Sequence, residues 1–271
     1  ADHAVFGYTI PWAQAQDAVL GYLKRVHNFN AEPEDLFWIH GLVPALNVFC
    51  RAVAEPGDEI LTCTPVYPPF LSAPGWQGTR LVTSALTLRD GRWTFDFADL
   101  EAKVTPRTRG FMLCHPHNPV GRVFSAEELQ QIGDFCLRHG LVLCSDEIHC
   151  DLLYAGAAHT MTAGLSPQLR DITITLHAPS KTYNLPGLSC AYAVIPNATL
   201  RAKFQRAARG FVTEVNLMGY AGCIAAYTEG EPWRQALMAY LTGNRDALYT
   251  FVEQRLSPAI TLPAPMAATY L

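Results

Sequence analysis

The sequence predicts an α/β protein, a three-layer αβα sandwich around a mainly parallel seven-stranded sheet. Two observations support this fold class. The chain has 271 residues, of which 49% are apolar, so it can bury a sizeable core. Short apolar runs alternate with segments of helical spacing, a pattern typical of a parallel sheet covered by helices. Seven runs have the length of a strand, at residues 36–39, 59–63, 80–83, 110–114, 141–145, 172–176 and 191–195.

The clearest predicted helix begins after Ser125. Ser125 and Glu128 have the spacing of a capping box, in which each side chain accepts a hydrogen bond from the other residue's backbone N–H. Apolar residues then recur on one helical face until Gly140, a residue type that commonly ends helices. The next apolar run follows at once, which gives the helix–strand alternation of an α/β fold.

After Asn197 the pattern becomes helical, over residues 200–209, 217–227 and 232–256. Prolines at 258, 263 and 265 then interrupt it. We therefore expect a large domain at residues 1–256 and the start of a second, C-terminal domain at 257–271.

Composition excludes several classes of protein. With 20 basic and 24 acidic side chains the net charge is −4, and no basic stripe is present, so we expect no nucleic-acid partner. The eight cysteines are scattered without a C-x-x-C pair, which predicts buried free thiols rather than a disulfide framework or a zinc site. The first residues lack the pattern of a signal peptide, and no apolar run is long enough to span a membrane. We expect a cytoplasmic protein with no membrane partner.

Polar residues follow several strands, at the edge where open α/β sheets bind ligands. After the first strand, His40 to Val43 could offer backbone N–H groups to an anion at a helix start, although Gly41 could also simply make the turn. After another strand, Asn118 presents an amide, in a dipeptide that is by default a structural turn. A metal site at Cys114, His115 and His117 is not expected, because successive strand side chains point in opposite directions.

Two further motifs carry charge. Asp146 and Glu147 follow a buried strand, where each carboxylate needs a partner; a cation or protonated ring nitrogen fits Asp146, and a helix cap is the alternative. His149 could contact a ligand or lie at the surface. Lys181 follows the next strand, either as a solvated lysine or as a partly desolvated nucleophile toward a carbonyl group.

In this order the motifs resemble the fold-type I pyridoxal 5′-phosphate enzymes of the aminotransferase class I/II group. Within that group they are similar to the MalY/PatB-type cystathionine β-lyases. The resemblance runs from Phe6 almost to Leu271 and rests on G-L-V, P-V-Y, N-P-V-G, S-D-E-I-H-C-D and S-K-T-Y-N. It implies the large domain of a PLP-dependent transferase fold and PLP as the cofactor.

The resemblance also implies roles for individual residues. Lys181 would bind the cofactor covalently, Asp146 would pair with its protonated ring nitrogen, Asn118 would bind its phenolate oxygen, and Tyr67 would stack on the ring. The phosphate would be bound by the backbone of Leu42 and Val43, by Ser180, and by Tyr8 of the other subunit of a homodimer with shared active sites. His149 completes the cofactor-binding set. Lys181, Tyr67 and Tyr8 are the candidate catalytic residues.

The activity implied is cleavage of cystathionine or related cysteine S-conjugates by α,β-elimination, giving a thiol, pyruvate and ammonia. His149 and Ser189 stand where aminotransferases usually have tyrosine and a phosphate-binding arginine, as they do in the lyase branch. An aminotransferase is the first alternative, because fold alone does not exclude it. A cofactor-retaining binding or regulatory protein with little turnover is the second.

The family normally has an N-terminal arm and a C-terminal small domain as well. The small domain carries an arginine that binds the substrate α-carboxylate, and this sequence has no counterpart of it. We therefore expect the sequence to be a segment of a longer protein, because it stops inside an apolar run with the pattern of a strand. The alternative is a truncated relative without full catalytic function.

Overall fold

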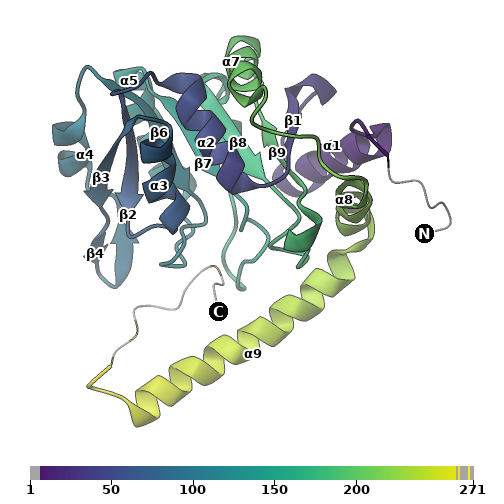
Figure 1. The fold of residues 1–271 in the computed structure, drawn as a ribbon. Coiled ribbons are helices and arrows are strands. Elements are labelled where there is room, and N and C mark those ends of the chain that lie inside the picture. Colours follow the sequence, from purple (N-terminus) through teal and green to yellow (C-terminus); the bar gives the residue numbers. More distant parts are fainter. Residues whose placement is uncertain (1–6, 261, 263–267, 269–271) are drawn as a thin grey trace.

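The computed structural model describes residues 7–260, 262 and 268. Its main sheet has seven strands in the order β1-β9-β8-β7-β6-β2-β3, and a small hairpin pairs β4 with β5 (Figure 1). The strands are β1 (Leu36–Ile39), β2 (Glu59–Thr64), β3 (Arg80–Ala85), β4 (Thr87–Arg89), β5 (Arg92–Thr94), β6 (Thr108–Cys114), β7 (Val142–Asp146), β8 (Thr173–His177) and β9 (Ala191–Val194). The predicted seven-stranded sheet is confirmed.

Strand direction sets which loops meet at one edge of this sheet. The pairs β3–β2, β2–β6, β6–β7 and β7–β8 are parallel. Both neighbours of β9 pair with it in antiparallel fashion. Strand β9 is therefore the one reversed strand of the seven described. The residues before β9 consequently lie at the same edge as the residues after the other strands.

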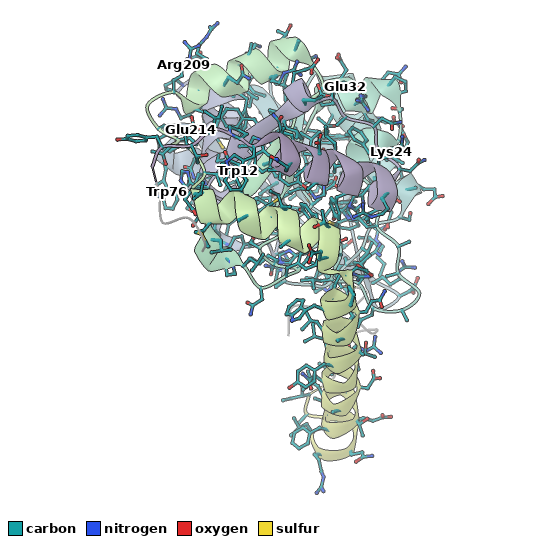
Figure 2. The ribbon with its side chains drawn as sticks, turned by 90° about the vertical axis from the view of Figure 1, so that its right-hand side faces the viewer. Trp12, Lys24, Glu32, Trp76, Arg209 and Glu214 are labelled. Carbon is teal, nitrogen blue, oxygen red and sulfur yellow. The ribbon has the colours of Figure 1, made fainter. Side chains whose placement is uncertain are left out.

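Helices cover both faces of the sheet. One face is covered by α2, α3 and α7, and the other by α1 and α8 at one end and by α4 and α5 at the other (Figures 1 and 2). The helices are α1 (Ala13–His27), α2 (Leu42–Val53), α3 (Pro68–Trp76), α4 (Phe97–Lys103), α5 (Ala126–His139), α6 (Pro167–Ile172), α7 (Ala198–Ala208), α8 (Leu217–Glu229) and α9 (Glu231–Arg255), with short 3-10 turns η1 (Pro33–Asp35), η2 (Thr162–Gly164) and η3 (Pro186–Leu188). These layers confirm the predicted αβα sandwich.

The alternation of strand side chains divides the core into the two faces. On β7, Cys144 packs among residues of α2 and α7, whereas Leu143 packs among residues of α5. On β8, Ile174 and Leu176 face the α2 side. Successive strand residues point to opposite faces, so Thr175 and His177 face the other side.

The predicted helix after Ser125 is confirmed in detail. Ser125 accepts a hydrogen bond from the backbone N–H of Glu128, and the Glu128 side chain accepts one from the Ser125 N–H, so the capping box is complete. Gly140 ends the helix in the left-handed conformation, with φ of 63°.

Helix α9 is the long helix predicted from residue 232 to 256. It projects away from the sheet layers (Figures 1 and 2). The expected second domain at 257–271 lies largely outside the described residues, as does Phe6. The domain boundary therefore stays a prediction.

Each of the eight cysteines is free and buried. Among the described residues, no helix combines the length and apolarity that crossing a membrane requires.

Candidate active site

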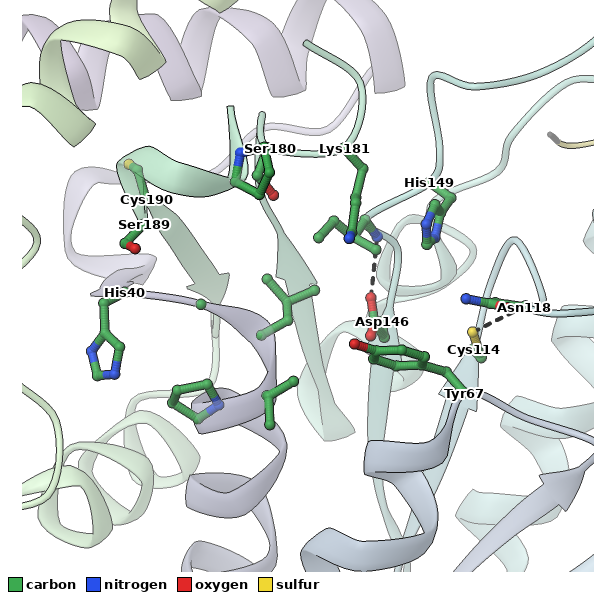
Figure 3. Close-up of a pocket in the computed structure, with 16 residues that line it drawn as sticks. His40, Tyr67, Cys114, Asn118, Asp146, His149, Ser180, Lys181, Ser189 and Cys190 are labelled. Carbon is green, nitrogen blue, oxygen red and sulfur yellow. Dashed lines mark hydrogen bonds between the residues drawn. The ribbon is translucent and has the colours of Figure 1, made fainter. Parts of the chain in front are cut away.

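A cavity of about 280 Å³ lies at the edge of the sheet where β1, β2, β6, β7 and β8 end (Figure 3). We call it the strand-edge cavity. Eight of the nine predicted site residues line it: Leu42, Val43, Tyr67, Asn118, Asp146, His149, Ser180 and Lys181. The parallel strands bring these residues together because their carboxyl ends share one edge.

One end of the cavity is suited to bind an anion. Helix α2 begins at Leu42, and Gly41 at its N-cap has no side chain to occupy the free N–H groups of the first turn. Helix N-termini carry partial positive charge, so the first-turn N–H groups attract a phosphate. Ser180 lines the same cavity and adds a hydroxyl. His40 lies beside this helix start, and its buried Nδ1 has no hydrogen-bond partner among the described residues.

Asp146 is the buried charge of the cavity. It is the last residue of β7 and only 6% exposed. Burial raises the pKa of its carboxyl group to about 7, while the backbone N–H of Ile148, which donates to Oδ1 at 3.2 Å, lowers it. Nearby Glu147 raises this pKa and nearby Lys181 lowers it. A cationic ring nitrogen at this position would favour the ionised carboxylate.

Lys181 and His149 lie on the side of Asp146 away from Tyr67, in the view of Figure 3. Lys181 follows β8 and is exposed, so its amine can be reached from the cavity opening. Burial, together with nearby Lys181, lowers the pKa of His149 to about 3, so the imidazole is neutral at pH 7. His149 is half-buried and lines the cavity, a position from which it can contact a ligand.

Tyr67 and Asn118 come from neighbouring loops. The backbone N–H of Tyr67 donates to the carbonyl oxygen of Asn118 at 3.1 Å, which ties the loops after β2 and β6 together. The Tyr67 ring lies alongside Asp146, and the Asn118 amide points toward the same space (Figure 3). A flat ligand between these groups would have an aromatic face on one side and an amide at its rim.

The structure does not bring Tyr8 into this cavity. Tyr8 is fully exposed and lies beside the segment from Glu214 to Met218. The three side chains considered and rejected as metal ligands have separate surroundings: Cys114 lines the cavity, His115 stacks on His159, and His117 Nε2 is 2.8 Å from the carbonyl oxygen of Pro65.

Sequence reasoning missed part of the lining. Cys190 reaches the cavity from the residues before β9, and Pro186 from the preceding turn. The reversed direction of β9 would have located them, but a four-residue apolar run does not reveal the direction of its strand.

Comparison with known proteins identifies the family. Residues 4–265 match the family described as aminotransferase class I and II. The chain belongs to this family. PatB, a cystathionine β-lyase of Bacillus subtilis, is 38% identical over 269 residues, which cover 98% of this chain and 69% of PatB. The predicted resemblance is confirmed.

Solved structures give the same result. The crystal structure of OvoB matches with a TM-score of 0.95 and 36% identity, over 99% of this chain and 70% of that one. Cystalysin from Treponema denticola, in a structure that contains PLP, matches with a TM-score of 0.93 and 33% identity, over 98% and 68%. The chain thus spans about two thirds of the length of these relatives. The comparisons confirm the predicted fold and the predicted cofactor, PLP.

Proposed function

We propose that this protein is a PLP-dependent carbon–sulfur β-lyase that cleaves cystathionine or related cysteine S-conjugates to a thiol, pyruvate and ammonia. The observation that carries the proposal is the strand-edge cavity, which gathers Lys181, Asp146, Asn118 and Tyr67 around one space next to the start of α2. The identity to PatB, a cystathionine β-lyase, supports the same activity.

The residues of the cavity fit PLP. The first turn of α2 and the Ser180 hydroxyl would bind the phosphate, and Lys181 would bind the aldehyde carbon through its amine. Asp146 would hold the ring nitrogen in its protonated form. That pairing suits the carboxylate, because burial without a cation raises its pKa to about 7. Tyr67 would cover the ring, and the Asn118 amide would donate to the phenolate oxygen.

When bound, PLP accepts electron density from the substrate Cα and so acidifies its proton. The chain's own task is to move that proton. Lys181 Nζ would be the base that takes the proton from Cα. Neutral His149, beside Lys181, adds no charge that would compete for Asp146. The electron pair left at Cα would expel the thiolate from Cβ, and addition of water to the remaining product would give pyruvate and ammonia.

An aminotransferase is the second candidate, and the family match itself favours it. Both reactions begin with removal of the Cα proton, and they differ in where the proton returns. His149 and Ser189 line the cavity at positions where, by the resemblance, aminotransferases carry a tyrosine and an arginine. These two residues favour the lyase.

We also propose that Tyr8 serves the cavity of a second subunit in a homodimer. Support comes from its position: it is fully exposed and is not among the residues that line its own chain's strand-edge cavity. A phenol hydroxyl in that place is available to a neighbouring subunit.

The experiment that tests the proposal measures products. Purified protein is supplied with PLP and L-cystathionine without any keto acid, and pyruvate is followed with lactate dehydrogenase. We expect pyruvate and ammonia in equal amounts. Product formation that requires an added keto acid would instead support the aminotransferase. Retained cofactor with no product in either assay would support the cofactor-retaining binding protein.

A further inference from the structure

A second group of polar residues lies on the other face of the sheet. His27 ends α1, His177 ends β8, and Cys150 follows β7 in the loop after Asp146. We call these three residues the His–Cys cluster. Their potential ligand atoms all lie within 4.8 Å of one another, and no residue of the cluster lines the strand-edge cavity.

The spacing of the cluster suits a tetrahedral metal ion. Cys150 Sγ is 3.8 Å from His27 Nε2 and 3.7 Å from His177 Nδ1. Zinc bonds to sulfur and nitrogen place two such ligand atoms about 3.6 Å apart in a tetrahedron. The two imidazole nitrogens need to approach to about 3.3 Å, a small swing for the half-buried ring of His27.

A phenol hydroxyl lies next to the cluster. Tyr22 Oη lies 3.0 Å from His27 Nε2 and 3.4 Å from Cys150 Sγ, and it donates a hydrogen bond to Asp151 Oδ2 at 2.6 Å. Tyr22, His27, Cys150 and Asp151 also line a cleft of about 640 Å³. The cleft gives an ion a path to the cluster and gives a water molecule access to the fourth position.

A buried carboxylate lies behind the cluster. Glu147 is fully buried, and Oε2 lies 3.7 Å from His177 Nε2 and 2.7 Å from His159 Nε2. Metal-binding histidines generally direct their second nitrogen to a carboxylate, which fixes the ring. His177 points Nδ1 toward Cys150 and Nε2 toward Glu147, and Nε2 needs to approach Oε2 by less than about 1 Å to form that hydrogen bond. Among the described residues, histidines are the only basic groups within ion-pair distance of Glu147.

We propose that the His–Cys cluster binds a zinc ion through His27 Nε2, Cys150 Sγ and His177 Nδ1, with Tyr22 or water as the fourth ligand. Two imidazoles and one thiolate form a ligand set that favours zinc over magnesium or calcium. The site links α1 to the ends of β7 and β8, and Cys150 directly follows His149 of the strand-edge cavity.

The charges and protons of this binding balance. Each neutral imidazole offers one lone pair to the ion, and the Cys150 thiol must lose its proton to bind as a thiolate. Binding of Zn²⁺ releases that one proton to solvent and leaves the thiolate on the ion.

The test measures metal binding to the holoprotein, with Zn²⁺ by calorimetry and with Co²⁺ by absorbance. We expect one equivalent of Zn²⁺ to bind. Co²⁺ should give visible bands of a four-coordinate ion, at wavelengths beyond the cofactor absorption, and Zn²⁺ should abolish them. His27→Gln and Cys150→Ser should each weaken Zn²⁺ binding by at least ~10–100-fold, and Glu147→Gln by a similar factor through the orientation of His177.

The chain offers matched controls. His139 is the last residue of α5, as His27 is of α1, and Cys136 is a buried thiol in the core beneath α5, outside the His–Cys cluster. His139→Gln and Cys136→Ser should bind Zn²⁺ as the parent does. The half-buried position of His27 at a helix end makes His27→Gln the variant that keeps the fold.

Absence of stoichiometric Zn²⁺ binding in the parent would overturn the proposal. So would parent-like binding in both His27→Gln and Cys150→Ser. Lyase activity plays no part in this test, so a failed lyase assay would leave the zinc result intact.

Discussion

One short segment, residues 145–151, builds parts of two different sites on opposite faces of the sheet. Asp146 and His149 line the strand-edge cavity, whereas Glu147 and Cys150 belong to the surroundings of the His–Cys cluster. Asp146 ends β7 and Glu147 follows it, so these neighbouring carboxylates point in opposite directions, and the turn at residues 148–151 then returns His149 to the cavity. Two acidic residues that are adjacent in sequence therefore need not belong to the same site.

The two sites stabilise their buried carboxylates differently. Glu147 accepts hydrogen bonds from the Ser145 hydroxyl and the Thr162 N–H and lies next to His159. The Asp146 carboxylate accepts only the Ile148 N–H among the hydrogen bonds described, and burial raises its pKa to about 7. The protein thus supplies hydrogen-bond partners for Glu147, whereas Asp146 needs a cationic ligand.

The largest expected effect is a loss of lyase activity when the strand-edge cavity is changed and the His–Cys cluster is not. Lys181→Ala removes the proposed base, so turnover of L-cystathionine should fall by at least ~10²–10⁴-fold. Borohydride should fix the cofactor to a Lys181 peptide in the parent, as read by mass spectrometry, and to no peptide in the variant. Zn²⁺ affinity should be unchanged. A borohydride-stable adduct at another lysine of the variant would refute the role of Lys181.

The second effect concerns Asp146 and the stability of the cofactor-free protein. Its pKa is about 7 when folded, against a usual value of 3.8. The folded state therefore binds more protons between pH 4 and 7, and stability decreases as pH rises through that window and is level above it. Asp146→Asn removes this loss, which amounts to about 4 kcal/mol at about 1.4 kcal/mol per pKa unit.

Thermal unfolding of cofactor-free protein at pH 4.5 and pH 8 measures this. The variant should be the more stable protein at pH 8, with a much smaller difference at pH 4.5. With cofactor bound, the same variant should lose most turnover, because a neutral amide does not hold the ring nitrogen protonated. Near-parent turnover would make Asp146 a structural carboxylate.

Three residues of the strand-edge cavity show what the sequence could predict. Asp146, Asn118 and Lys181 each lie at or just after the end of a buried strand. Strand ends of a parallel sheet share an edge, so the local pattern placed these residues together. The seven strands and the capping box at Ser125 could be predicted for the same reason, because strand patterns and helix capping depend on residues that are close in sequence.

The His–Cys cluster was not readable from the sequence. His27, Cys150 and His177 come from a helix end, a loop and a strand end that are separated by more than a hundred residues at the widest. Only packing of α1 against the sheet brings them together, and no spacing motif records it. The reversal of β9, which brings Cys190 to the strand-edge cavity, depends on tertiary pairing in the same way.

The third effect asks whether the strand-edge cavity needs a second subunit. A hydrogen bond to a charged group contributes about 1.5–3 kcal/mol, so Tyr8→Phe should weaken PLP affinity by roughly 10- to 150-fold. Dilution of the parent below its dimer dissociation constant should release PLP as well, by linkage between binding and assembly. Sedimentation velocity and cofactor dissociation measure these effects.

Zn²⁺ binding provides the contrast, because every proposed ligand of that ion is on one chain. It should be the same in Tyr8→Phe and in diluted protein. Equal PLP affinity in Tyr8→Phe and the parent, with the dimer intact, would reject the cross-subunit role.

The smallest effect tests what Tyr67 contributes through its ring. An aromatic stacking contact is worth about 0.5–1.5 kcal/mol beyond its buried area, so Tyr67→Ala should weaken PLP affinity by roughly 2- to 13-fold. Tyr67→Phe keeps the ring and should bind PLP within about 2-fold of the parent. Tyr67 is 38% exposed, so neither change should affect folding, and thermal unfolding provides the check. If Tyr67→Phe lost as much affinity as Tyr67→Ala, the hydroxyl rather than the ring would be the binding group, and the stacking role would be wrong.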